Sequence, residues 1–249
     1  MTTNPTTALY HFSKEGNLEA LKNWVADNSV QPYWLARAIE YAAYAGKSEV
    51  LPFLMETLRK ESFYDLTCAL ELGAEQGHLE CVKLLLPQST PQLRKSQAFR
   101  HGALHADMID LLLPYSDLEA NENEAVLYAV LLCVSHNRLD NIQKLMPHWT
   151  HKHLDHHQLP LTHAASLGHR KIVAYLLDHL DASLNQSAPL KAALGNRDME
   201  TSLLLIPQSV EEHVLPAFEG EPGPYAWIQK QFLLVRTQPT SQHRSLRRL

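Results

Sequence analysis

The sequence has little glycine and little cysteine, and both shortages restrict the fold. Among 249 residues there are 9 glycines, no stretch alternates apolar and polar side chains for long, and leucine and alanine are abundant. This composition predicts an all-α protein. The 3 cysteines, Cys68, Cys81 and Cys133, are too few and too scattered for a disulfide framework. We therefore expect reduced, mostly buried thiols and a cytoplasmic location.

Features that would direct the chain to a membrane or to nucleic acid are also missing. The longest apolar run, residues 125–134, has 10 residues, about half of what a bilayer span needs, so we expect a buried helix there. Residues 1–7 are polar and lack the basic-then-apolar pattern of a signal peptide. The net charge of −5 leaves no strongly basic surface for nucleic acid. We expect neither a membrane nor a nucleic acid as partner.

Motifs that would indicate a catalytic or cofactor site are absent from the sequence. There is no GxSxG, GxxxxGK[ST], GxGxxG or HExxH pattern. We therefore predict no catalytic residue, no cofactor and no enzyme activity.

The sequence does contain a repeat. A block of the form Gly77-His78-Leu79-Glu80-Cys81-Val82-Lys83-Leu84-Leu85-Leu86-Pro87 has six further copies. The seven blocks start at Gly16, Gly46, Gly77, Leu104, Asn137, Gly168 and Arg197, and successive starts lie 30, 31, 27, 33, 31 and 29 residues apart. A period of about 30 residues is typical of helical repeat arrays.

All copies have a similar pattern of residue types. Counting the start as zero, position +3 is acidic in six copies, as the first turn of a helix favours. Positions +5, +8 and +9 are mostly apolar and form one helical stripe. Position +10 is proline in four copies, Pro87, Pro114, Pro147 and Pro207, and should end the helix there. A stretch with small residues, such as 73–74 or 164–165, precedes each start and predicts a closely packed first helix.

The clearest copy, residues 159–177 (LPLTHAASLGHRKIVAYLL), resembles an ankyrin repeat. It has the Pro-Leu start, the Ala-Ala pair, the Gly-His turn and the apolar pattern of the second helix. The resemblance implies a helix-pair solenoid of about seven ankyrin-like repeats that binds other proteins. His78 and His169 follow the turn glycine, and we interpret both as structural. Departures from the family, Leu159 and Thr162 among them, predict short or degraded β-hairpin fingers.

The pattern divides the chain into three parts. Residues 1–207 form the predicted repeat array, and residues 208–235 contain C-terminal capping helices, of which 225–235 covers the last repeat. Residues 236–249 hold Arg236, Arg244, Arg247 and Arg248 without a core pattern, and we expect a disordered basic tail.

A histidine cluster lies between two copies, in residues 147–159. His148, His151, His153, His156 and His157 surround Asp155, and the spacing of four between His153 and His157 is one that metals use. Three interpretations stay open: a plain polar loop, a loop that contacts a partner, and a metal site.

Aromatic side chains outside the expected core are candidate anchors for a partner protein. Trp149 lies in the histidine-rich segment, so we expect it on the surface, together with His151, His153, Asp155 and His156. Tyr33 and Trp34, between the first two copies, are the second candidates. Trp24 and Trp227 fall on predicted core stripes.

The sequence thus favours a protein–protein interaction module. Two alternatives remain: a metal-dependent enzyme or metal-binding protein that uses the cluster from His148 to His157, and a structural protein that self-assembles. The degenerate array also resembles ankyrin-type effectors that intracellular bacteria deliver into host cells. The sequence leaves open the identity of the partner and the oligomeric state.

Overall fold

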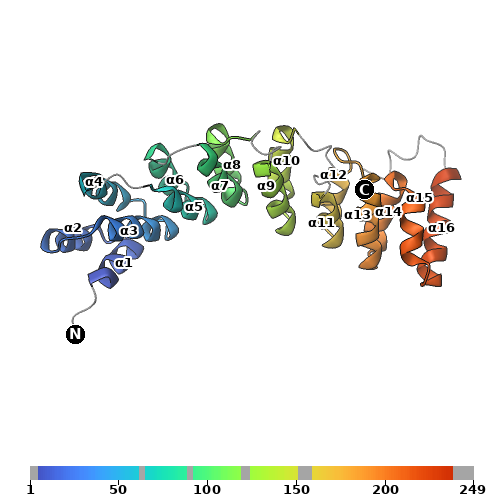
Figure 1. The fold of residues 1–249 in the computed structure, drawn as a ribbon, viewed down its shortest axis with the longest axis horizontal. Helices are drawn as coiled ribbons and strands as arrows, with labels where there is room; N and C mark the ends of the chain where they lie inside the picture. The colour runs from blue at the N-terminus through green and yellow to red at the C-terminus, as the bar shows by residue number, and fades with distance from the viewer. Residues whose placement is uncertain (1–4, 62–64, 89–91, 119–123, 151–158, 238–249) are drawn as a thin grey trace. The chain divides into compact units, whose positions relative to one another are not determined.

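The computed structural model describes residues 5–61, 65–88, 92–118, 124–150 and 159–237. Over these ranges every regular element is a helix, which confirms the all-α prediction (Figure 1). The α-helices are α1 Pro5–Glu15, α2 Leu18–Asp27, α3 Pro32–Tyr44, α4 Leu51–Glu61, α5 Thr67–Glu75, α6 Leu79–Leu85, α7 Gln92–Gly102, α8 Ala106–Leu112, α9 Glu124–Ser135, α10 Leu139–Leu145, α11 Leu159–Ser166, α12 Arg170–Leu176, α13 Leu184–Gly195, α14 Met199–Leu205, α15 Glu211–Val214 and α16 Pro222–Thr237. The short 3-10 helices are η1 Leu86–Gln88, η2 Leu113–Tyr115, η3 Met146–His148, η5 Ile206–Gln208 and η6 Leu215–Phe218.

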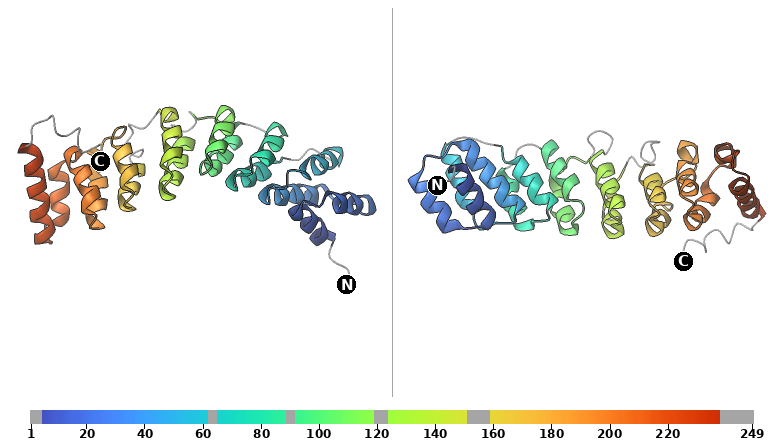
Figure 2. Two further views of the ribbon diagram at one scale, coloured as in Figure 1. Left: turned by 180° about the vertical axis from the view of Figure 1, so that it is seen from behind. Right: turned by 90° about the horizontal axis from the view of Figure 1, so that it is seen from below.

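Contacts divide the chain into two compact units, Met1–Ala129 and Val130–Leu249, with the boundary inside α9. In the first unit, α1, α3, α5 and α7 pack in succession, and each also contacts the helix that follows it, from α2 to α8 (Figure 2). In the second unit, α11 packs on α13 and α12 on α14, and α13 also contacts α15. Each unit is therefore a stack of helix pairs. Within α13, residues 185–187 have left-handed φ values, so the regular helix begins after them.

The predicted starts are the turns that join the two helices of a pair. Six of the seven have a left-handed backbone, at Gly16, Gly46, Gly77, Asn137, Gly168 and Arg197. At Gly77 the turn is closed by two backbone bonds: the N–H of Gly77 donates to the carbonyl of Ala74 at 3.1 Å, and that of His78 to Gly73 at 2.9 Å. This pattern satisfies the last carbonyls of the first helix. It explains why glycine, which adopts φ above zero without strain, recurs here.

Histidines at the next position tie successive pairs together in the first unit. The His78 ring Nε2 hydrogen-bonds the carbonyl of Tyr44 at 3.1 Å, and the His105 Nε2 hydrogen-bonds that of Glu75 at 2.9 Å. Each carbonyl lies at the end of the preceding first helix, where no helical N–H can reach it. The structural interpretation of His78 is confirmed.

The repeated prolines end the second helices as predicted. Pro87, Pro114, Pro147 and Pro207 each lie in a 3-10 turn that directly follows α6, α8, α10 or α14. Proline has no N–H for the helical ladder, so the chain tightens into i to i+3 turns there.

The repeated apolar positions form the core. Side chains at position +5, namely Leu21, Leu51, Val82, Ile109, Ile142 and Val173, are all buried. The small residues of the first helices, such as Ala43, Ala74 and Ala164, are buried as well. In the last copy, position +5 is Ser202, whose buried hydroxyl donates to the carbonyl of Asp198 at 2.7 Å. Asp198 also caps α14, because its carboxylate accepts from the backbone N–H of Thr201 at 3.0 Å.

The C-terminal helices extend slightly further than predicted. Residues 208–218 hold α15 and η6, and α16 includes the expected helix at 225–235 but continues to Thr237. The expected disordered tail therefore begins too early at residue 236. The Arg236 guanidinium lies 2.5 Å from the Glu211 carboxylate, and a cation is favoured in the last turn of a helix. The remaining tail residues, 238–249, lie outside the described ranges.

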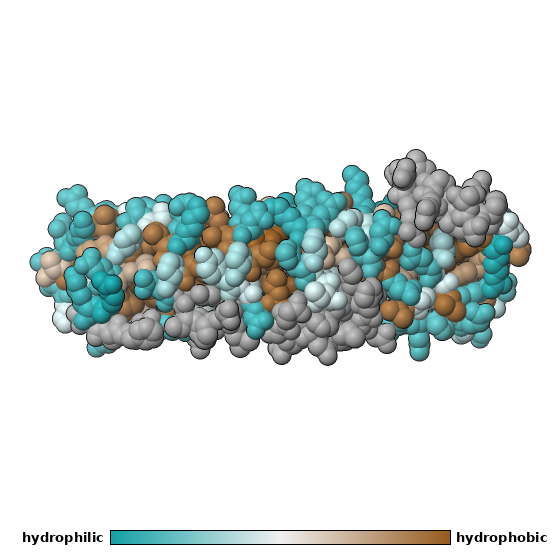
Figure 3. All heavy atoms as spheres, turned by 90° about the horizontal axis from the view of Figure 1, so that it is seen from above, coloured by the Kyte–Doolittle hydropathy of each residue, from teal (hydrophilic) through white to brown (hydrophobic). Residues whose placement is uncertain are grey.

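The surface seen in Figure 3 has hydrophobic atoms interspersed with hydrophilic side chains. Exposed leucines of the second helices include Leu84, which lines a pocket with Pro52 and Met55, and Leu203, which shares a helix face with exposed Met199. None of the helices within the described ranges is long and apolar enough to cross a membrane.

Candidate binding surface

The first predicted anchor, Trp149, is in the core. Its side chain is 1% exposed, so the expectation of a surface position was wrong. The 3-10 turn η3 brings the chain back, and the Trp149 N–H donates to the carbonyl of Met146 at 3.2 Å. The repeat itself indicated that Trp149 is buried. Trp149 is at position +12 of its copy, and the same position holds buried Leu58 and Leu180 in two other copies.

The polar candidates of the same segment are outside the described residues. This applies to His151, His153, Asp155 and His156, so their predicted contact with a partner stays a prediction. Among the residues that the structure does describe, no group of three or more His, Cys, Asp or Glu is placed to hold a metal ion. The metal interpretation of the cluster therefore stays untested.

The second pair of candidates lies on the surface. Pro32 occupies the first turn of α3, where its missing N–H costs nothing. Tyr33 and Trp34 follow it and are 50% and 39% exposed, with ring centroids 4.8 Å apart. Two large aromatic rings are thus presented to solvent at the N-terminal end of a first helix.

Helical spacing extends this aromatic surface along α3. Trp34, Arg37, Tyr41 and Tyr44 follow one another at intervals of three and four residues, so they share a face. The opposite face, with Leu35, Ile39 and Ala42 among others, is fully buried. The apolar core thus fixes the orientation of α3 and leaves the aromatic stripe outside it.

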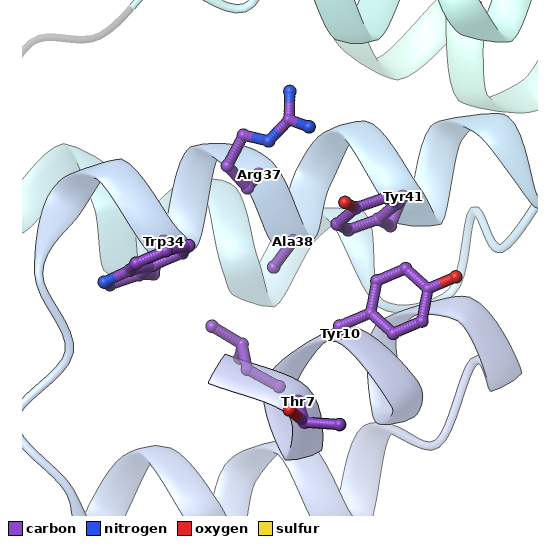
Figure 4. Close-up of a pocket in the computed structure, with 7 residues that line it drawn as sticks. Thr7, Tyr10, Trp34, Arg37, Ala38 and Tyr41 are labelled. Atoms are coloured by element: carbon purple, nitrogen blue, oxygen red, sulfur yellow. The ribbon is translucent and has the colours of Figure 1, made fainter. Parts of the chain in front are cut away.

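A groove separates this stripe from α1. It has a volume of about 280 Å³ and is lined by Thr7, Leu9, Tyr10, Trp34, Arg37, Ala38 and Tyr41. Figure 4 shows Tyr10 and Thr7 on one side, and Trp34, Ala38 and Tyr41 on the other. The rings of Tyr10 and Tyr41 meet edge to face with centroids 4.1 Å apart, and so close one end of the groove.

Charged groups lie close to the two tyrosines of the groove. The Arg37 guanidinium lies 5.4 Å from the centre of the Tyr41 ring and donates to the Glu40 carboxylate. The Lys14 ammonium lies 5.8 Å from the centre of the Tyr10 ring. Burial raises the pKa of Glu40 and outweighs the lowering effect of Arg37, while the Glu40 carboxylate raises the pKa of Arg37. Arg37 is thus the charged side chain that lines the groove, and it lies beside the Tyr41 ring.

A second exposed aromatic of a first helix has the same kind of partner. The Arg100 guanidinium of α7 lies 4.2 Å from the centre of the Tyr128 ring of α9, and Tyr128 is 43% exposed. Arginine and tyrosine are both enriched among the residues that anchor protein interfaces.

The cysteines do not contribute to a reactive site. Burial raises the pKa of Cys81 to about 11 and that of Cys133 to about 12, so neither is a thiolate at neutral pH. Cys81 and Cys133 are buried, in agreement with the expectation of mostly buried thiols, whereas Cys68 of α5 is exposed.

Sequence reasoning missed Tyr10, Arg37 and Tyr41 as parts of this surface. The signal for Arg37 and Tyr41 was their spacing from Trp34 on one helix face. No such signal existed for Tyr10, since its position depends on how α1 packs against α3.

No protein-family model matches this chain, and no curated protein is significantly similar to it.

Proposed function

We propose that this chain is a protein–protein interaction module, an ankyrin-like repeat array that acts as a scaffold or adaptor and catalyses no reaction. The observation that supports the proposal best is the aromatic surface of α3. A buried core holds this helix in place, and its exposed side carries tyrosine, tryptophan and arginine, the residue types that dominate binding energy in interfaces.

The repeat organisation also supports binding. Stacked helix pairs present their first helices side by side, and such arrays use this surface to hold partners. The resemblance of residues 159–177 to an ankyrin repeat favours the same function. An effector role in a host cell and a cytoplasmic location remain parts of the proposal.

Affinity capture tests this function. The tagged native chain is incubated with cell extract beside a Tyr33→Ala, Trp34→Ala double variant, and the retained proteins are quantified by mass spectrometry. A matched control is Leu84→Ala, which removes a 38% exposed leucine from the second helix α6. Circular dichroism verifies that all three chains fold equally.

The proposal predicts a partner that the native chain and the control retain in equal amounts and that the double variant loses about tenfold, as expected for two interface anchors. The proposed function is refuted if the native chain retains no protein. Equal retention by all three chains would refute the assignment of α3 as the binding surface.

A further inference from the structure

The groove between α1 and α3 has two walls with matched spacing. On α1, the lining residues Thr7 and Tyr10 are three residues apart, and on α3 Trp34, Arg37 and Tyr41 follow one another at intervals of three and four residues. Residues at these intervals share a helix face. The two faces meet across the groove, as the contact between α1 and α3 and the lining residues show (Figure 4).

The polar groups of the groove are mainly hydrogen-bond donors. The indole of Trp34 and the guanidinium of Arg37 can only donate, and the hydroxyls of Thr7, Tyr10 and Tyr41 can donate as well as accept. Arg37 donates to Glu40, but a guanidinium has five N–H groups and so keeps further donors. The groove therefore suits a ligand that offers acceptors and few donors.

An extended proline-containing peptide has this chemistry. Proline has no backbone N–H, and the polyproline II conformation has no internal hydrogen bonds, so its carbonyl oxygens remain free acceptors. Its pyrrolidine rings pack against aromatic side chains, and aromatic-lined grooves are the usual receptors for such segments. A helical peptide satisfies its own carbonyls and would leave most of the donors in the groove unused.

The charge of the groove lining favours an acidic residue in the ligand. Arg37 lines the groove and lies beside the ring of Tyr41, and Lys14 lies beside the ring of Tyr10 on α1. The acid on the α3 side, Glu40, is the partly buried partner of Arg37, and its side chain is 14% exposed. On α1, the Glu15 carboxylate lies 3.3 Å from the His11 ring, and neither residue lines the groove. The lining residues thus include the positive Arg37 and no carboxylate, which favours an acidic side chain in the ligand.

We propose that the groove between α1 and α3 binds an extended, proline-containing segment of a partner protein that carries an acidic side chain. This inference rests on the proposed function and names the partner chemistry of its main surface. Trp34 packs against proline rings, and Arg37 binds the acidic side chain.

Fluorescence anisotropy with labelled peptides tests the proposal. The main probe is a peptide of about nine residues, all proline except for one central aspartate. In the polyproline II conformation this peptide spans roughly 28 Å. A second probe replaces the aspartate by lysine, and a third keeps the aspartate among glycine and serine. Each is titrated with the native full chain and with the Trp34→Ala, Arg37→Gln and Leu84→Ala variants, after thermal melts establish that all variants fold.

The acidic proline peptide should bind the native chain about tenfold more tightly than either other probe. Trp34→Ala should weaken it about tenfold, Arg37→Gln should abolish the preference for aspartate over lysine, and Leu84→Ala should change nothing. The inference is overturned if the peptide without proline binds as tightly as the main probe, if the lysine peptide binds more tightly, or if Trp34→Ala leaves the affinity unchanged. It is also overturned if the native chain does not bind the main probe. If the native chain still captures a partner through α3 but binds no acidic proline peptide, this inference fails and the proposed function stands.

Discussion

Replacing Gly77 by alanine should destabilise the first unit through two separate effects. The backbone of Gly77 is left-handed, with φ of 77°, and this conformation costs a residue with a Cβ about 1–2 kcal/mol. The new Cβ would also lie 2.6 Å from Nδ1 of the His105 ring. The ring must then move and lose its hydrogen bond to the carbonyl of Glu75, which is worth about 1 kcal/mol. The expected total is about 2–3 kcal/mol.

Urea unfolding followed by circular dichroism measures this loss. The control is Gly195→Ala, because a Cβ at Gly195 meets no atom within 4 Å and alanine suits a helix better than glycine. We expect that control to leave stability unchanged or to raise it by about 0.5–1 kcal/mol.

A double-mutant cycle separates the two effects. His105→Ala removes the ring, so Gly77→Ala in that background should cost only the backbone term, about 1–2 kcal/mol. The reasoning is refuted if Gly77→Ala and Gly195→Ala have equal stability, or if the effects of Gly77→Ala and His105→Ala are additive.

Three further predictions concern the core, a helix cap and the thiols. Ile142→Ala at a fully buried position should lower the free energy of unfolding by about 2–5 kcal/mol, measured by urea titration. Asp198→Ala removes the side-chain cap of α14 and should cost about 1 kcal/mol by the same assay. In the folded chain a thiol reagent should label exposed Cys68 first, and Cys81 and Cys133 only on unfolding. Since burial raises the pKa of the latter two from 9.0 to about 11 and 12, the unfolded chain releases these protons first, and stability should fall as pH rises above about 9.

Each of these predictions has an outcome that contradicts it. Leu203→Ala is the control for Ile142→Ala, because it changes a 48% exposed side chain and should alter stability by less than about 0.5 kcal/mol. If Ile142→Ala lowers stability by no more than this control, the assignment of Ile142 to the core is contradicted. Unchanged stability of Asp198→Ala would contradict the cap. Equal labelling rates for all cysteines would contradict the burial of Cys81 and Cys133, and stability that is flat above pH 9 would contradict their raised pKa values.

Local features of the fold were predictable because each depends on a few neighbouring residues. A left-handed turn needs a residue such as Gly77 or Asn137, and a helix ends where Pro147 removes an N–H. Both features can therefore be recognised from the residue types in the sequence. The division into two units inside α9 could not be recognised in this way, because it depends on contacts between helices. Whether the array is an ankyrin solenoid stays a proposal.

The candidate site was predicted in part. Tyr33 and Trp34 were expected on the surface because they lie between two copies of the repeat, and they are exposed there. Trp149 was misplaced because the polarity of its sequence neighbours was weighed above its position in the repeat. Tyr10 could not be found at all, since only the packing of α1 on α3 brings its ring to Tyr41.

Hydrogen–deuterium exchange of the chain, alone and with its captured partner, tests the central claim most directly. If the chain binds a protein through the first helices of its first unit, peptides that cover α1 and α3 should gain protection, while those from the second helices α4 and α6 should not. Protection confined to residues 147–159 or to the second helices would contradict the account, and so would an exchange pattern that the partner leaves unchanged.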